Sequence, residues 1–119
     1  MKTILLVGMP PEVCQQVEKL AGGNCKIVAK EADRDERSQF YKEHPTIVVL
    51  NARWSDGHWG PNARSLAEEM VKVGGVTVIA VSSFNYDRTL FEKSFFEKSC
   101  CQFCRPEELN DILQGELSL

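Results

Sequence analysis

Short runs of apolar, mostly β-branched residues recur along this 119-residue chain, separated by segments with the apolar spacing of helices. Four runs lie at residues 3–7, 25–29, 46–50 and 76–81. Continuous rather than alternating apolar character is typical of parallel strands covered on both faces. A fifth, weaker run at residues 100–104 is interrupted by Gln102, as an edge strand would be. This alternation predicts five β-α units that form one parallel sheet with helices on both faces.

Turn and capping residues mark the helices between these runs. Apolar residues at helical spacing predict a first helix between Pro11 and Gly22 and a third between Pro61 and Gly74. The capping-box-like pair Asp33 and Glu36 predicts a second helix that ends before Pro45 and is mostly exposed. A fourth helix is predicted to begin at Asn85 and to bury Leu90 and Phe91. A fifth would carry Glu107 and Glu108 in its first turn and end at Gly115.

The length and composition favour one ordinary globular domain spanning residues 1–119. The chain is 43% hydrophobic and 26% charged, and its net charge of −3 is spread without a basic stripe, which disfavours nucleic-acid binding. No apolar run is long enough for a membrane span or a signal peptide. Five cysteines without framework spacing favour reduced thiols, and we therefore expect a cytoplasmic protein.

In a sheet of this kind, ligands bind outside the carboxyl ends of the strands. The residues at those positions are Gly8 and Met9, Asn51, Ser82 with Ser83, and Arg105-Pro106. They are the candidate site residues of the chain.

These positions carry a family resemblance. Residues 45–51, which end in Asn51, look like the third strand of a receiver leading to its phospho-accepting aspartate, and Asp56-Gly57 looks like the following loop. Ser82 and Arg105-Pro106 match the places of the hydroxyl residue and the Lys-Pro pair. The chain thus resembles, over essentially its whole length, the receiver domain of two-component response regulators. That resemblance implies a flavodoxin-like (βα)5 three-layer sandwich of strand order 2-1-3-4-5 and a role in signal transduction.

The sequence departs from the receiver pattern where the chemistry is most demanding. Phosphoryl transfer to a receiver needs an ionised carboxylate as nucleophile and further carboxylates that hold Mg²⁺. Asn51 carries an amide, and Gly8 and Met9 replace the acidic pair. Arg105 replaces a compact ammonium with a planar guanidinium, and Gln102 stands where receivers place an aromatic switch residue. We therefore expect a degenerate pseudo-receiver that is not an enzyme, binds no metal or cofactor, and signals without phosphorylation.

Such a domain would act through its surface, on a signalling protein or on a second copy of itself. The loop 52–60 holds both tryptophans, Trp54 and Trp59, which either contact a partner or close as a lid over Met9. Phe95 and Phe96 are candidate apolar contacts for a homodimer through the fourth helix, fifth strand and fifth helix.

Two other interpretations stay open. In the first, Asn51, Ser82 and Arg105 are ordinary loop residues of a flavodoxin-like domain, because a fold alone does not fix function. In the second, Cys101 and Cys104 form a thiol redox sensor. Strand geometry argues against the second, since it directs these two side chains to opposite faces. Zinc, nucleotide and flavin sites lack the ligand spacing or the phosphate-binding turn that each requires.

Overall fold

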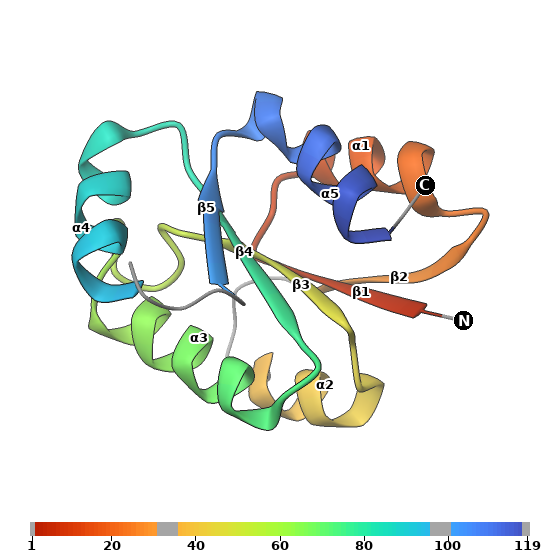
Figure 1. Ribbon diagram of the computed structural model, residues 1–119, viewed down its shortest axis with the longest axis horizontal. Coiled ribbons are helices and arrows are strands. Elements are labelled where there is room, and N and C mark those ends of the chain that lie inside the picture. The colour runs from red at the N-terminus through yellow and green to blue at the C-terminus, as the bar shows by residue number, and fades with distance from the viewer. Residues whose placement is uncertain (1, 31–35, 96–100, 118–119) are drawn as a thin grey trace.

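The computed structural model describes residues 2–30, 36–95 and 101–117. Five parallel strands form one sheet in the order β2-β1-β3-β4-β5 (Figure 1). The strands are β1 (Lys2–Val7), β2 (Cys25–Lys30), β3 (Ile47–Asn51), β4 (Thr77–Val81) and β5 (Cys101–Cys104). This is the flavodoxin-like arrangement, so the predicted fold class and strand order are confirmed.

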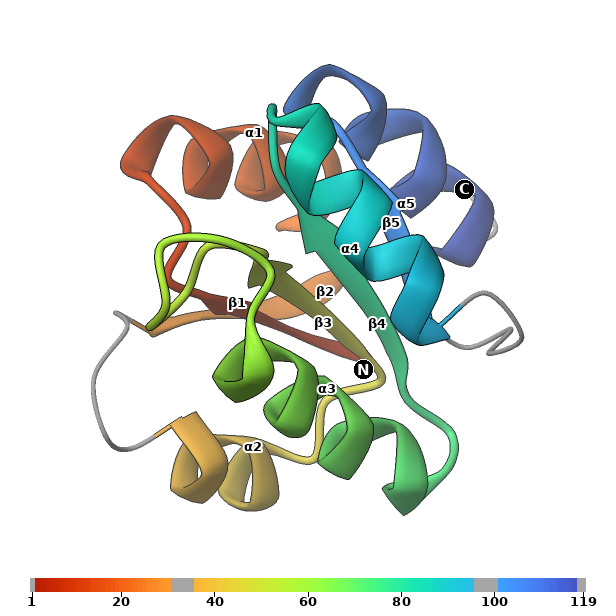
Figure 2. The ribbon, with the colours of Figure 1, turned by 90° about the vertical axis from the view of Figure 1, so that its left-hand side faces the viewer.

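Helices cover both faces of the sheet and complete three layers (Figures 1 and 2). One face is covered by α1 (Pro11–Ala21) and α5 (Leu109–Leu117), the latter preceded by the 3-10 turn η1 (Pro106–Glu108). The other face is covered by α2 (Glu36–Glu43), α3 (Pro61–Val73) and α4 (Asn85–Phe95). None of the helices in the described part of the chain combines the length and the apolar character needed to cross a membrane.

Each central strand contributes to two apolar cores. In β1, Leu5 and Val7 pack into the core beneath α2, α3 and α4, whereas Ile4 and Leu6 pack into the core beneath α1 and α5. All four side chains are at most 1% exposed. Burial of such a side chain stabilises the fold by about 1.5–3 kcal/mol. Two-sided burial therefore explains why the run is continuously apolar.

The structure corrects three details of the predicted elements. β2 lies at an edge of the sheet and leaves Lys26 and Ala29 exposed, although its apolar run suggested a strand covered on both faces. Glu107 and Glu108 lie in η1 and not in the first turn of α5. α5 continues beyond Gly115 to Leu117, because Leu117 packs into the core. The predicted cap Asp33 lies outside the described residues.

Candidate functional site

The carboxyl ends of the strands place the candidate residues along one edge of the sheet. β1 ends in Gly8, whose φ of 66° lies in the left-handed region that glycine adopts most easily. Its backbone N–H donates to the carbonyl of Lys30 at 2.8 Å. The chain then turns so that half-buried Met9 packs against the core beneath α1 and α5. An apolar side chain thus occupies the loop where a receiver would need acids.

Asn51 ends β3, and both polar ends of its amide are used within the protein. Its Nδ2 donates to the carbonyl of Gly8 at 3.0 Å, and its Oδ1 accepts from the backbone N–H of Arg53 at 2.9 Å. The first bond joins the ends of β1 and β3, and the second shapes the start of the following loop. Asn51 is therefore a structural link between two strand ends.

Ser82 follows β4 and forms a buried hydrogen bond that sequence reasoning did not anticipate. Its hydroxyl donates to the carboxylate of Asp87 at 2.6 Å and accepts from the backbone N–H of Phe84 at 3.1 Å. Asp87 lies in the first turn of α4 and is fully buried. The hydroxyl therefore serves the turn from β4 into α4.

A clasp formed by Arg53, Ser82 and Asp87 joins the loop after β3 to the start of α4. Arg53 Nε lies 3.0 Å from Asp87 Oδ2, and its guanidinium lies 3.7 Å from the centre of the Phe84 ring. The other carboxylate oxygen accepts from the backbone N–H of Trp59 at 2.9 Å. The Asp87 carboxylate therefore accepts from three donors, two of them on the loop after β3.

The charge of Asp87 is stabilised by this surrounding. Burial acts to raise the pKa of Asp87, but the hydrogen bonds from Ser82, from the Trp59 backbone and from Arg53, with the Arg53 charge, outweigh it and hold the pKa below its usual range. An ionised carboxylate that accepts hydrogen bonds from three internal donors in this way serves the structure of the protein. Its oxygens are committed to the protein's own N–H and O–H groups.

The hydrogen bonds of the three polar candidates fall into two separate sets. Asn51 and Ser82 are connected through Arg53 and Asp87, but Arg105 lies outside that network. Its guanidinium donates to the carbonyl of Ser83 at 3.1 Å and to Oδ1 of Asn85. Arg105 thus holds the entry into α4.

The tryptophans are buried, and neither ring offers the widely exposed face that a partner contact would favour. Trp54 is 9% exposed and Trp59 is 3% exposed. Trp54 Nε1 donates to the buried carboxylate of Glu36 at 3.0 Å, and Trp59 packs edge to face on Phe91 at 5.3 Å between ring centres. Both rings belong to the core beneath α2, α3 and α4, whereas Met9 packs on the opposite face. They therefore form no lid over Met9 either.

The cysteine pair occupies opposite faces of β5, as strand geometry predicts. Cys101 belongs to the core beneath α2, α3 and α4, and Cys104 to the core beneath α1 and α5. Both are buried, and burial raises the pKa of Cys104 to about 12. A thiol in this state is a poor nucleophile. This geometry does not favour a disulfide between the two.

The remaining candidates have the following places. Asp56, the carboxylate nearest the strand ends in the loop after β3, accepts from the backbone and the side chain of Asn62 at 3.0 and 2.9 Å. Phe95 ends α4, and its side chain is not described, while Phe96 lies outside the described residues. Within residues 2–30, 36–95 and 101–117, no three His, Cys, Asp or Glu side chains gather as a metal site.

Comparison with known structures identifies a shared fold. The chain superposes on CpaE, a pilus assembly protein from Burkholderia thailandensis, with a TM-score of 0.62 over 100% of both chains. The two are 17% identical. At this identity the likeness establishes the common fold. No protein-family model and no curated protein matches the sequence.

Arg53 and Asp87 are the site residues that sequence reasoning missed. They are separated by 34 positions, and in the sequence they resemble ordinary charged residues of a loop and of a helix. The available signal was an aspartate in the first turn of the fourth predicted helix, a short distance after the hydroxyl at the end of β4. That signal indicates a helix start, and it does not reveal the arginine.

Proposed function

We propose that this chain is a pseudo-receiver, a receiver-like signalling domain that acts through protein–protein contact and is not switched by phosphorylation. The observation that carries this proposal is the state of Asn51. It stands at the end of β3, where a receiver carries its nucleophile, and its amide is held by Gly8 and by the backbone of Arg53. An amide in this position offers no anionic oxygen to a phosphoryl donor.

The surroundings of Asn51 support the same conclusion. The loop after β1 carries Met9 in place of acids, and the buried carboxylate of Asp87 is saturated by Ser82, Arg53 and the Trp59 backbone. Mg²⁺ binds through oxygen atoms that the protein leaves available. A site whose oxygens are engaged internally gives the ion and a phosphoryl group little to bind.

The fold supports the receiver part of the proposal. The strand order and the full-length superposition on CpaE agree with a receiver-like domain. That neighbour is described as a pilus assembly protein, and assembly depends on contacts between proteins. By this proposal the chain is not an enzyme, and its partner is another signalling protein or a second copy of itself.

The decisive experiment is incubation of the full chain with Mg²⁺ and acetyl phosphate, followed by intact-mass measurement. We expect no added phosphoryl group. The matched variant Met9→Asp/Asn51→Asp introduces one metal-binding acid and a carboxylate nucleophile. If this variant alone gains a phosphoryl group, the residues at positions 9 and 51 are the reason that the unmodified chain does not. A phosphoryl adduct on the unmodified chain, lost at high pH as an acyl phosphate would be, contradicts the proposal.

A further inference from the structure

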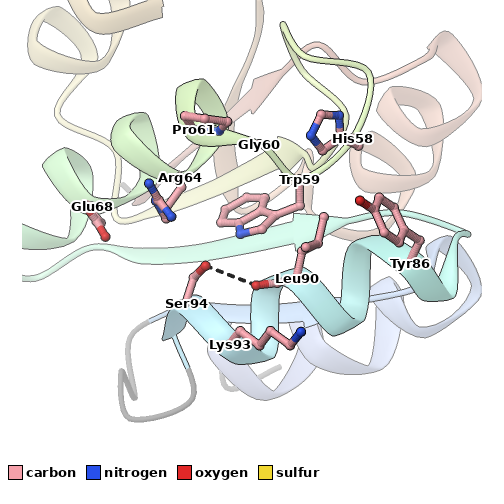
Figure 3. Close-up of a pocket in the computed structure, with 10 residues that line it drawn as sticks. All are labelled: His58, Trp59, Gly60, Pro61, Arg64, Glu68, Tyr86, Leu90, Lys93 and Ser94. Atoms are coloured by element: carbon pink, nitrogen blue, oxygen red, sulfur yellow. Dashed lines mark hydrogen bonds between the residues drawn. The ribbon is translucent and has the colours of Figure 1, made fainter.

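A groove of about 570 Å³ opens between α3 and α4, beside the loop that follows β3 (Figure 3). Its floor is the ring of Trp59, and its α4 side carries Tyr86 and Leu90. Tyr86 is 62% exposed and Leu90 is partly exposed. This volume lies within the range of protein ligand sites, about 300–1,000 Å³. The groove therefore offers an apolar base with an aromatic ring at its rim.

Cationic side chains line both sides of this groove. Arg64 projects from α3 and Lys93 from α4, on opposite sides of the Trp59 ring (Figure 3). Both are exposed, and neither forms an ion pair with the described residues. The lining contains one acid, Glu68. The groove is thus locally basic on a chain whose net charge is −3.

We propose that this groove binds an acidic peptide segment of a partner protein, one that carries an aromatic or aliphatic side chain. The apolar residue would lie against Leu90 and Tyr86, which supply the exposed apolar surface above the buried Trp59 ring, and flanking carboxylates would pair with Arg64 and Lys93. Complementary charge argues for this occupant, because charges on both walls favour an anionic segment lying between them. The inference rests on the proposed function in one respect, namely that contact is the activity of the domain.

A labelled peptide provides the direct test. The probe is a fluorescein-labelled peptide of repeating Glu-Phe-Glu-Leu composition, titrated with the full chain and followed by fluorescence anisotropy. The control probe has Gln in place of each Glu. We expect binding of the acidic probe to weaken as salt rises, because screening reduces exposed charge interactions, and we expect about tenfold weaker binding of the neutral probe.

Charge-reversal variants locate the binding. Arg64→Glu/Lys93→Glu is expected to weaken binding about tenfold or more, whereas Lys42→Glu/Lys72→Glu, which makes the same change of net charge at exposed sites on α2 and α3, should stay within about twofold. Tyr86→Ala should also weaken binding, with Tyr41→Ala on α2 as the matched exposed control. Amide chemical shifts of each variant verify that it is folded.

Several outcomes would overturn the inference. They are equal binding by both charge-reversal variants, preference for the neutral probe, or a concentration-dependent dimer that Arg64→Glu/Lys93→Glu abolishes while the peptide does not compete. The last result would assign the groove to a second copy of the chain. Failure here is distinct from failure of the proposed function, because uptake of phosphate is measured separately. If the chain takes up no phosphoryl group and also binds no acidic peptide, the proposal for the groove is wrong and the proposed function still stands.

Discussion

At the scale of single residues, the polar groups at the strand ends form hydrogen bonds that hold neighbouring elements together. Asn51 joins the ends of two strands, Ser82 holds a turn, and Arg53 reaches across to α4. Each of these bonds joins residues on different elements or fixes the start of a loop. Substitution of these residues should therefore mainly lower the free energy of unfolding.

Asp87 gives the sharpest residue-scale prediction. Asp87→Asn keeps the size of the side chain but removes the charge-assisted bonds, and we expect a loss of about 1–3 kcal/mol in the free energy of unfolding at pH 7. The folded-state pKa of Asp87 is lowered, so its contribution is complete above the unfolded pKa of about 3.9 and is lost as pH falls through the lower folded value.

Urea unfolding at several pH values measures this effect. The stability difference between the wild type and Asp87→Asn should narrow as the solution becomes strongly acidic. Asp111→Asn, at an exposed position on α5, serves as the matched control and should change stability little. A difference that is constant with pH would show that the charge of Asp87 makes no contribution.

The residue scale is also where sequence reasoning was least complete. Asn51, Ser82 and Arg105 were found because they follow apolar runs. The contacts of Arg53 and Glu36 were not found, because their partners Asp87 and Trp54 are distant in sequence. The sequence around a charged residue does not indicate which distant carboxylate or indole that residue will contact.

At the scale of elements, apolar periodicity predicted the strands and helices because two-sided burial leaves a direct trace in the sequence. The end of α5 shows the limit of that rule. Gly115 has low helix propensity, yet Leu113 and Leu117 on either side of it are buried, and their packing outweighs the local preference for a stop. Tertiary contact, which the sequence alone does not display, decided that boundary.

Two glycines should respond oppositely to alanine. Gly115 lies within α5 with open space around the position of a Cβ, so Gly115→Ala should stabilise the protein by about 0.5 kcal/mol. Gly75 has a φ of 69°, so Gly75→Ala should destabilise it by about 1 kcal/mol through backbone strain. Thermal unfolding of both variants gives the comparison, and equal effects would contradict it.

The fifth strand yields a prediction about thiol reactivity. Cys104 is 1% exposed with a pKa raised to about 12, so its alkylation in the native protein should require opening of the structure. Iodoacetamide labelling followed by peptide mass analysis should therefore find Cys104 at least about tenfold slower than in the urea-unfolded chain. Rapid labelling of Cys104, or a Cys101–Cys104 disulfide formed under mild oxidation, would favour the redox interpretation instead.

At the scale of the whole molecule, the order of the strands was predicted from the resemblance, whereas the alternation of apolar runs and helices predicted only one parallel sheet covered on both faces. The assignment of faces was not predicted. Both tryptophans follow β3 and were expected near Met9, but their loop folds over the core beneath α2, α3 and α4. Loop direction depends on side-chain contacts between residues that are distant in sequence.

Divalent ions should leave the whole molecule unchanged. In its described residues the structure gathers no group of three His, Cys, Asp or Glu side chains that could hold a metal ion, and the ionised carboxylate of Asp87 is already bonded to internal donors. The unfolding temperature measured by calorimetry should therefore agree, within error, in excess Mg²⁺ and in EDTA. A clear rise with Mg²⁺ would reveal a site in the native state, because a ligand that binds only the folded protein stabilises it.

The clasp around Asp87 has a consequence for how this edge of the sheet takes its shape. Here the anion is supplied by the chain, so it enters the site in the same event that forms the tertiary structure. The conformation of this edge is therefore set by the folding of the chain itself.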